Sequence, residues 1–284
     1  MISARAFAKL TLSLRVLGTR ADGFHELDAL TVSVSEPHDE LTIALGNEAD
    51  GVELELSGAA AAGISAGPAN LAVRAAHAML ARASRGEQRV AGVRIALHKM
   101  IPAGAGLGGG SADAAAVLVA LDQLLELGLP IDDIAAIGAT LGSDVPFCVR
   151  GGAAHMRGRG ERVEPTVVPT LYALIAVPPF AIATPAVYRA WDELGGPASA
   201  RVVEGPAGVG PLTNDLEPAA ERVEPRLAGF RDALERTAGS PAVLAGSGSA
   251  CAVVYTEELA AAAARDRVVA AGIAATCAVG YLPC

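Results

Sequence analysis

Alternating apolar and polar positions dominate the first fifth of the chain. Residues 7–17 (FAKLTLSLRVL) alternate over several positions, which is typical of a half-buried strand. The same period of two recurs further on, and it predicts strands over 27–34, 41–45 and 52–56. The N-terminal fifth is therefore expected to be rich in strands.

Apolar positions at helical spacing appear next. Leu71, Ala75 and Met79 recur on one face of a helix. Ser111 follows a glycine-rich loop and is the expected N-cap of the helix after it. The elements predicted in this region are a helix over 69–83, a strand over 90–98, and helices over 111–127 and 131–141.

The second half of the chain mixes strands and helices without a regular strand–helix–strand alternation, which favours the α+β class. We expect two domains, 1–162 and 163–284, and an exposed loop over 195–211, which is rich in Gly, Pro and Ala. One predicted strand begins at Gly151, and further strands are predicted over 171–177, 242–244, 252–255 and 274–279. Helices are predicted over 185–194, 215–223, 226–237 and 257–271.

Composition supports a globular protein with a sizeable core. The chain has 284 residues, of which 52% are hydrophobic and 19% charged, and this balance excludes intrinsic disorder. The longest uncharged stretch, residues 165–188, contains five prolines, so it does not predict a membrane-spanning helix. The net charge of −9 and the lack of a basic cluster argue against a nucleic-acid partner.

Cysteine and histidine positions indicate neither metal nor disulfide chemistry. The four cysteines form no Cys-x-x-Cys pair, and the histidines show no metal-ligand spacing. We therefore expect no metal site and a reducing, cytoplasmic compartment, since the first residues contain no apolar segment of signal-peptide length.

Residues 101–115 (IPAGAGLGGGSADAA) form a dense run of glycines. A Walker A loop needs a lysine where Gly110 stands, so that motif fails. Gly104, Gly106 and Gly109 match the Rossmann fingerprint in spacing. However, the helix that follows leads into another helix rather than into a parallel strand that ends in an acidic residue.

Two interpretations of this loop remain. Glycines let the backbone approach a phosphate closely, and the N–H groups of the next helix bind anions, so the loop is expected to hold phosphate. The simpler alternative is a tight turn capped by Ser111, with no ligand. The three consecutive glycines disfavour this alternative, because such a turn loses backbone entropy without a gain in packing.

Eight segments together carry a resemblance to a known family. They are AKLTL (8–12), RADGFH (20–25), KMIP (99–102), PAGAGLGGGSADAA (102–115), LGSDVP (141–146), GRGE (158–161), NDL (214–216) and GSG (246–248). In this order they resemble the motifs of the GHMP kinase superfamily. Within it, they are similar to the family that phosphorylates 4-diphosphocytidyl-2-C-methyl-D-erythritol in the non-mevalonate isoprenoid pathway.

The resemblance implies a two-domain GHMP kinase fold, with a ribosomal-S5-domain-2-like N-terminal domain and a ferredoxin-like C-terminal domain. It implies transfer of the γ-phosphoryl group of ATP, bound with Mg²⁺, to the 2-hydroxyl of the cytidine diphosphate substrate. The expected partner is this small molecule, with no nucleic acid and no membrane, and the chain is expected to be a monomer or weak homodimer. A GHMP kinase for another alcohol, of homoserine or mevalonate type, and a non-catalytic nucleotide-binding sensor are the alternatives.

The catalytic residues that the resemblance implies are Lys9 and Asp144. By sequence alone, Asp144 in GSDVPF is better read as a cap of the following turn, whereas the family motif makes it the base for the acceptor hydroxyl. The alternation places Lys9 opposite Leu10 and Leu12, so a solvated lysine is the simpler alternative. The family motif instead makes Lys9 the electrostatic partner of Asp144.

The ATP-binding positions implied by the resemblance lie around the glycine loop. Lys99 is weighed there against an ordinary surface lysine at a strand end, and only it and Lys9 are lysines among the 22 basic residues. The implied positions are Asn70, Lys99, Pro102, Gly104, Gly106, Leu107, Gly108, Gly109, Gly110 and Ser111.

The acceptor-binding positions implied by the resemblance include two aromatic rings around the cytosine base. They are Thr11, Phe24, His25, Thr184 and Tyr188. The sequence departs from the family at three places: Thr11 stands where Asn is usual, Phe24 where Tyr is usual, and Ala245 where Ser or Thr is usual. Of these, Thr11 bears most on the choice of acceptor.

Overall fold

Strands β1 (Ile2–Thr19) and β2 (His25–Gly46) each contribute to two compact units. Unit 1 consists of residues 1–8, 38–102 and 108–151, and unit 2 consists of residues 9–37, 103–107 and 152–284. The computed structural model describes residues 1–46, 51–84, 92–196 and 200–280. The predicted division into domains 1–162 and 163–284 remains a prediction.

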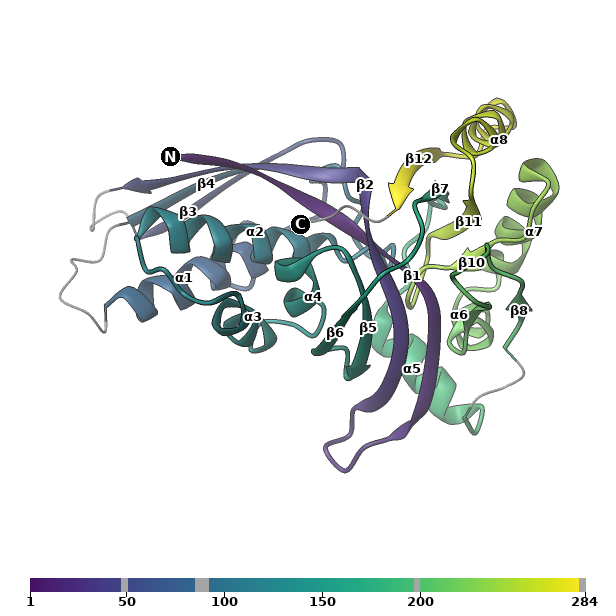
Figure 1. The fold of residues 1–284 in the computed structure, drawn as a ribbon, viewed down its shortest axis with the longest axis horizontal. Coiled ribbons are helices and arrows are strands. Elements are labelled where there is room, and N and C mark those ends of the chain that lie inside the picture. The colour runs from purple at the N-terminus through teal and green to yellow at the C-terminus, as the bar shows by residue number, and fades with distance from the viewer. Residues whose placement is uncertain (47–50, 85–91, 197–199, 281–284) are drawn as a thin grey trace. The chain divides into compact units, whose positions relative to one another are not determined.

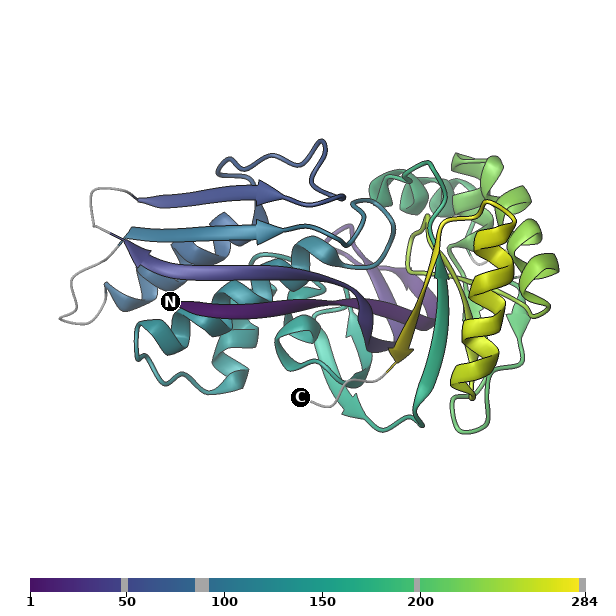
Figure 2. The ribbon, with the colours of Figure 1, turned by 90° about the horizontal axis from the view of Figure 1, so that it is seen from above.

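The sheet of unit 1 is built around strand β4 (Gly92–His98). The second half of β2 pairs with β4 in antiparallel fashion, with Ile43 opposite Ile95, and β3 (Val52–Ser57) pairs with β4 in parallel. Helix α1 (Leu71–Ala83) connects β3 to β4. Figures 1 and 2 show the helices of unit 1 gathered on one face of this sheet.

Four helices complete unit 1, and their apolar faces form its core. Besides α1 they are α2 (Gly109–Leu124), α3 (Ile131–Ala139) and the short α4 (Val145–Arg150). Fully buried side chains from these helices and from the sheet form a continuous core, which contains Leu41, Ile43, Met79, Ile95, Leu97, Leu118, Leu121 and Phe147. This core supports the glycine-rich start of α2.

The strands of unit 2 follow the order β10-β11-β7-β12-β2-β1-β9-β8. Strand β5 also pairs with β2, and β6 pairs with β5. The bounds are β5 (Ala153–Gly158), β6 (Arg162–Thr166), β7 (Leu171–Ala176), β8 (Val202–Val203), β9 (Leu212–Asn214), β10 (Val243–Leu244), β11 (Cys251–Tyr255) and β12 (Ala275–Gly280).

Four helices belong to unit 2: α5 (Thr184–Glu193), α6 (Glu217–Val223), α7 (Arg226–Ala238) and α8 (Glu258–Ala270). Helix α8 lies along β7, β11 and β12, as Figure 2 shows. Leu174, Val253 and Leu234 are fully buried in this layer. Within the described part of the chain, no helix has both the length and the apolar character needed to cross a bilayer.

The predicted strands and helices are found with shifted ends among the described residues, and the structure differs from the expectations in several places. Residues 90 and 91 of the predicted strand over 90–98 and residues 197–199 of the predicted loop lie outside the described residues. Residues 27–34 and 41–45 form one continuous strand, β2, rather than two. Helix α4 was not predicted, and Pro146 near its start fits the first turn of a helix. The expected loop over 195–211 contains the short strand β8, which pairs with β9.

Candidate active site

The first turn of α2 opens without any side-chain cap. Gly108 is the N-cap with φ 71°, and the helix begins at Gly109, so Ser111 lies in the first turn and the prediction that it caps the helix is wrong. The left-handed conformation at Gly108 is one that glycine adopts readily. The N–H groups of the first turn have no partners within the helix, and such groups bind phosphate.

A buried ion cluster lies directly under this turn. Lys99 Nζ donates to Asp113 Oδ2 at 2.6 Å and also to Asp39 Oδ2. Asp39 Oδ1 accepts from the backbone N–H groups of Met100 and Ile101 at 2.5 and 2.8 Å. Lys99 is only 2% exposed, so the alternative of a surface lysine is wrong.

The start of α2 packs closely on this cluster, and burial shifts the pKa of Asp113. A Cβ placed on Gly109 would come within 2.9 Å of Ile101 and 3.4 Å of Lys99 Nζ, so the helix start rests on these side chains. Burial raises the pKa of Asp113 to about 7; the Lys99 ammonium opposes this shift, whereas the Asp39 carboxylate adds to it. The contact of Lys99 with the nucleoside of ATP stays a prediction.

Asp144 and Ser111 belong to neighbouring segments of unit 1. Asp144 is the residue before α4, but its side chain makes no capping hydrogen bond, so the capping interpretation is wrong. A Cβ placed on Gly142 would lie 3.8 Å from Ser111 Oγ, which shows that the Ser111 hydroxyl faces the loop that carries Asp144. A hydroxyl at a helix start and a carboxylate thus lie on adjacent segments.

Asn70 has a local structural role in addition to its predicted one. Its Oδ1 accepts from the Ala72 N–H at 2.9 Å and caps α1, and its Nδ2 donates to the Ser65 carbonyl at 2.8 Å. Its predicted contact with ATP is not tested by this geometry.

Two glycine loops meet in unit 2. The carbonyls of Gly104 and Ala105 accept from the N–H groups of Ser249 and Ala250 at 3.2 and 3.0 Å. Gly106 adopts φ 80°, and a Cβ placed on it would lie 2.0 Å from the Ala245 carbonyl oxygen, so only glycine fits there. Residues 103–107 and 245–250 therefore form one paired backbone structure.

Lys9 lies beside both glycine loops. Its backbone N–H donates to the Leu107 carbonyl at 2.9 Å, and its Nζ would lie 3.5 Å from a Cβ on Gly246. Lys9 is only 8% exposed, so the simpler alternative of a solvated, outward-facing lysine is wrong. The reason is that both faces of β1 are covered at this point, and the alternation of the strand does not separate core from solvent.

Thr11 extends the polar contacts of Lys9. Lys9 Nζ donates to Thr11 Oγ1 at 3.5 Å, and Thr11 Oγ1 shares a 3.4 Å hydrogen bond with Thr31 Oγ1. Both threonines are buried. The residue that departs from the family pattern is therefore a direct neighbour of the candidate catalytic lysine.

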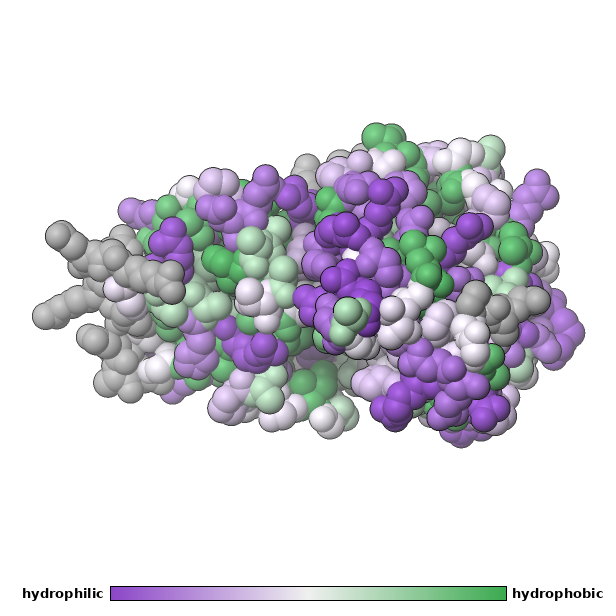
Figure 3. All heavy atoms as spheres, turned by 90° about the horizontal axis from the view of Figure 1, so that it is seen from below, coloured by the Kyte–Doolittle hydropathy of each residue, from purple (hydrophilic) through white to green (hydrophobic). Residues whose placement is uncertain are grey.

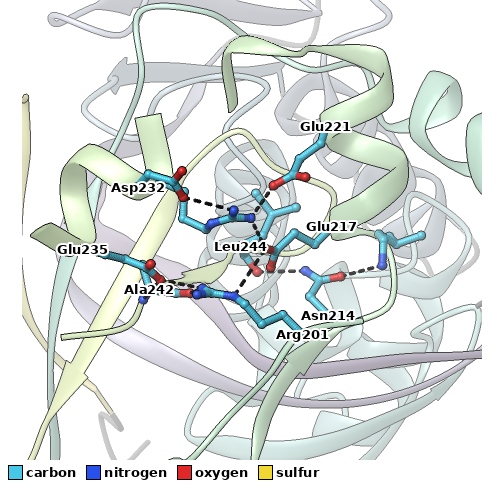
Figure 4. Close-up of polar contacts among 10 residues, drawn as sticks. Arg201, Asn214, Glu217, Glu221, Asp232, Glu235, Ala242 and Leu244 are labelled. Carbon is cyan, nitrogen blue, oxygen red and sulfur yellow. Dashed lines mark hydrogen bonds and ion pairs between the residues drawn. The ribbon is translucent and has the colours of Figure 1, made fainter. Parts of the chain in front are cut away.

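A buried asparagine holds the second glycine loop. Asn214 Nδ2 donates to the Leu244 carbonyl at 2.8 Å (Figure 4). It also donates to the Gly246 carbonyl at 2.7 Å, and its Oδ1 accepts from the Leu216 N–H at 2.9 Å. Every polar group of this side chain thus bonds to backbone. The NDL segment has a clear physical function, which is to fix the path of the chain into the loop.

Ion pairs surround the strand that precedes this loop. Arg201 Nη2 donates to Glu235 Oε1 at 2.6 Å and to the Ala242 carbonyl (Figure 4). Arg231 donates to Glu217, whose carboxyl is largely buried. Burial raises the pKa of Glu217, while Arg231 and Arg201 act in the opposite direction. These contacts connect α6 and α7 to β10 and have a structural role.

His25 lies in a cage of α5 side chains. Its imidazole stacks on Tyr188 with ring centroids 4.7 Å apart and meets the edge of Trp191 at 5.2 Å. Its Nε2 lies 2.8 Å from Asp192 Oδ1. Of the predicted acceptor residues, His25 and Tyr188 are thus in contact, whereas Trp191 and Asp192 were not predicted.

Phe24 lies next to this cage at the turn between β1 and β2. The ring is 52% exposed, and the Arg159 guanidinium lies 4.7 Å from its centroid. Arg20 and Glu26 pair at 2.7 Å across the same turn. Figure 3 shows hydrophilic side chains gathered around the end of this hairpin, where an exposed aromatic ring is unusual and available for stacking.

Thr184 contacts the second glycine loop. Its Oγ1 shares a 2.7 Å hydrogen bond with Ser247 Oγ. Helix α5 therefore carries Thr184 at its start and the His25 cage further along, so it connects the loop with the residues predicted to hold a base.

Long-range contacts explain which residues were missed. Asp113 belongs to the recognised glycine motif but was read as part of the helix, and Asp39 lies in an unremarkable strand segment. Asp192 meets His25 from a position 167 residues away. No local pattern predicts such a pair.

The arrangement is suited to binding phosphates and an aromatic base. Unit 1 offers the N–H groups at the start of α2 and the Asp144 carboxylate, and unit 2 offers a buried lysine beside a glycine loop and an imidazole in an aromatic cage. Among the residues that the structure describes, no group of three or more His, Cys, Asp or Glu side chains is placed to hold a metal ion.

Family models match both halves of the chain. Residues 70–152 match the GHMP kinases N terminal domain, and residues 207–274 match the GHMP kinases C terminal model. A 4-diphosphocytidyl-2-C-methyl-D-erythritol kinase from Moorella thermoacetica is 41% identical over 263 residues, which cover 88% of each chain.

Solved structures agree with these matches. A crystal structure of a 4-(cytidine 5'-diphospho)-2C-methyl-D-erythritol kinase superposes with a TM-score of 0.80 at 33% identity, covering 99% of this chain and 100% of the other. A homoserine kinase from Cytophaga hutchinsonii gives a TM-score of 0.62 at 20% identity, covering 99% of this chain and 95% of the other, and so shares the fold.

Proposed function

The chain belongs to the 4-diphosphocytidyl-2-C-methyl-D-erythritol kinases of the GHMP kinase superfamily, and from this premise we propose how its residues perform the reaction. The protein is an ATP-dependent kinase of isoprenoid precursor synthesis. The γ-phosphoryl group of ATP passes to the 2-hydroxyl of the cytidine diphosphate substrate. The bond between the γ-phosphorus and its bridging oxygen breaks, and ADP leaves.

Asp144 accepts the proton of the attacking hydroxyl as the new phosphorus–oxygen bond forms. This role is supported by its position in the loop that faces Ser111 at the start of α2. Lys9 supplies positive charge near the transferred group and favours the ionised form of Asp144.

The burial of Lys9 is the single observation that carries this proposal. A lysine is almost never buried in a protein unless its charge has a partner. Here the ammonium lies beside Gly246 of the second glycine loop and the Thr11 hydroxyl, where a positive charge is suited to attract phosphate oxygens.

The phosphate cradle consists of the glycine loop and the first turn of α2. The N–H groups after Gly108 point along the helix axis and donate hydrogen bonds to phosphate oxygens, and Ser111 adds a hydroxyl. Asn70, Lys99, Pro102, Gly104, Gly106, Leu107, Gly109 and Gly110 complete the proposed ATP-binding residues.

Magnesium is proposed to enter with ATP rather than through a protein cage. Mg²⁺ that is bound with a nucleotide needs only one or two protein ligands. Bound Mg²⁺ would neutralise charge on the phosphate oxygens, and Ser111 is the residue that would hold it.

The acceptor is proposed to place its cytosine between Phe24 and Tyr188, with His25 on the edge of the base. The exposed Phe24 ring and the stacked His25–Tyr188 pair support this assignment. Thr184 and Thr11 are proposed to contact the rest of the acceptor. We further propose a cytoplasmic enzyme that is a monomer or weak homodimer, which sedimentation velocity would test.

The direct test measures ADP release from Mg-ATP with and without 4-diphosphocytidyl-2-C-methyl-D-erythritol, with homoserine and mevalonate as competing acceptors. Release that depends on the cytidine substrate is the expected result. Turnover with only another alcohol would overturn the acceptor assignment and point to Thr11. ATP binding without turnover on any acceptor would indicate a sensor.

A further inference from the structure

Asp192 fixes one face of His25. Its Oδ1 lies 2.8 Å from His25 Nε2 and also accepts from Thr19 Oγ1 at 3.4 Å. The imidazole is 9% exposed, whereas the Asp192 side chain is 48% exposed. The carboxylate thus lies at the rim of the aromatic cage, with one oxygen directed inward to the ring.

This contact determines which nitrogen of the ring carries the proton. A carboxylate oxygen can only accept, so the nitrogen that faces it must bear a hydrogen. In the neutral imidazole the other nitrogen, Nδ1, then has a free lone pair and can only accept. A partner on one nitrogen therefore sets the hydrogen-bonding character of the other.

The aromatic neighbours keep the ring in this orientation. Tyr188 covers one face of the imidazole at 4.7 Å, and Trp191 meets it nearly at right angles at 5.2 Å. A 180° flip of the ring would put the carbon Cε1 in the place of Nε2 and would break the contact with Asp192. The acceptor character of Nδ1 is thus built into the cage.

Helix stability does not explain Asp192. The residue lies in the last turn of α5, where the carbonyl end of the helix dipole disfavours negative charge by about 0.3–1 kcal/mol. The next residue, Glu193, is also acidic and lies 3.7 Å from Arg222. An aspartate in this position is better explained by its contact with His25.

We propose that Asp192 is a positioning residue that makes the site selective for cytosine over uracil by holding His25 with Nδ1 as an acceptor. This inference rests on the proposed function. Cytosine presents its exocyclic amine, a donor, where uracil presents a carbonyl oxygen. An Nδ1 lone pair pairs with the amine and repels the carbonyl, whereas the opposite tautomer would reverse this preference.

The first experiment measures turnover of Asp192→Ala with the cytidine substrate and with its uridine analogue. KM for the cytidine substrate is expected to rise about 10-fold, and the selectivity for cytidine to fall about 10-fold, as expected when one oriented hydrogen bond is lost. The values of kcat and of KM for ATP should stay unchanged, because α5 keeps its fold and the phosphate cradle is untouched.

Glu193→Ala is the matched control. It removes a carboxylate from the adjacent position of the same helix, where the side chain is 64% exposed, and should leave both KM values and the selectivity unchanged. A loss of selectivity in both variants would indicate a general charge effect and overturn the proposal.

The second experiment reads the tautomer directly by ¹⁵N NMR of histidine-labelled protein, with His25→Gln to assign the signals. The parent protein at pH 8 should show His25 protonated at Nε2, and Asp192→Ala should show a mixture of tautomers. An unchanged tautomer in Asp192→Ala would overturn the proposal. This measurement needs no turnover, so it separates failure of the proposal from failure of the proposed function.

Discussion

The Lys99 ammonium lies 2.6 Å from Asp113 Oδ2, and both groups are buried under the first turn of α2. On its other side the ammonium meets Asp39. One positive charge thus stands between two carboxyl groups, and Asp113 Oδ1 has no hydrogen-bond partner in the described part of the chain. The cluster is neutral when Asp113 binds a proton and negative when it does not.

This cluster should make stability depend on pH. The Asp113 carboxyl has an ordinary pKa of 3.8, and burial raises that pKa to about 7 in the folded chain. Between these values the folded state binds one more proton than the unfolded state, so the free energy of unfolding should fall as pH rises from about 4 to 7. Asp113→Asn should flatten this dependence. Urea unfolding across pH 4–8 checks the comparison, and equal slopes for both proteins would contradict it.

Asp144→Asn should lower kcat by about 10²–10⁴-fold, because the amide cannot take the proton of the acceptor hydroxyl. The Kd for ATP should remain nearly unchanged. Steady-state kinetics and calorimetric titration with ATP measure the two quantities. Asp132→Asn, at a 75% exposed position in α3, is the control and should behave as the parent protein. Near-normal turnover in Asp144→Asn would contradict the proposed mechanism.

Thr11→Val should lower kcat about 10-fold and stability by about 1 kcal/mol, because it removes the hydroxyl that touches Lys9 Nζ. Thr31→Val removes the other half of the threonine pair and leaves the contact with Lys9 in place. It should therefore cost similar stability but little turnover. Parallel thermal melts and kinetics would show this split, and equal kinetic losses would remove Thr11 from the site.

Phe24→Ala should raise KM for the cytidine substrate about 10-fold or more and leave KM for ATP unchanged. Stacking of a base on an aromatic side chain contributes about 1–3 kcal/mol. Leu17→Ala, another exposed apolar position on the same hairpin, serves as the control. If KM rises equally for both substrates, Phe24 does not belong to the acceptor site.

Gly106→Ala should destabilise the protein by about 2 kcal/mol, because the new methyl group would meet the Ala245 carbonyl and φ is positive. Gly110→Ala tests the same change in the same motif. There the methyl group would lie 3.5 Å from Leu71, inside α2, so stability should be unchanged or slightly higher. Thermal melts distinguish the two variants, and equal melting temperatures would contradict the packing of the two loops.

Local sequence patterns predicted secondary structure well where a single pattern, such as strand alternation or glycine density, dominated a segment. The period of two found β1 and β3, and glycine density found the phosphate loop. Ser111 was misassigned as the N-cap because its residue type favours that place, whereas the left-handed backbone at Gly108 ends the loop three residues earlier. Burial of Lys9 was missed because alternation alone does not show that both faces of a strand are covered.

The candidate site was predicted only as far as the motifs reached. Glycine density predicted a phosphate loop, and the family motifs added Lys9, Asp144 and His25. The partners that orient these groups come from distant segments, such as Asp192 for His25 and Thr31 for Thr11. These contacts depend on the register of the whole sheet, which no short stretch of sequence determines.

The paired glycine loops have a consequence for synthesis of the chain on the ribosome. The carbonyls of Gly104 and Ala105 receive their backbone hydrogen bonds from Ser249 and Ala250, near the far end of the sequence. A nascent chain therefore contains the whole glycine motif long before it can close the loop. A chain whose translation stops before these residues contains the whole glycine motif but cannot form the backbone hydrogen bonds that pair the two loops.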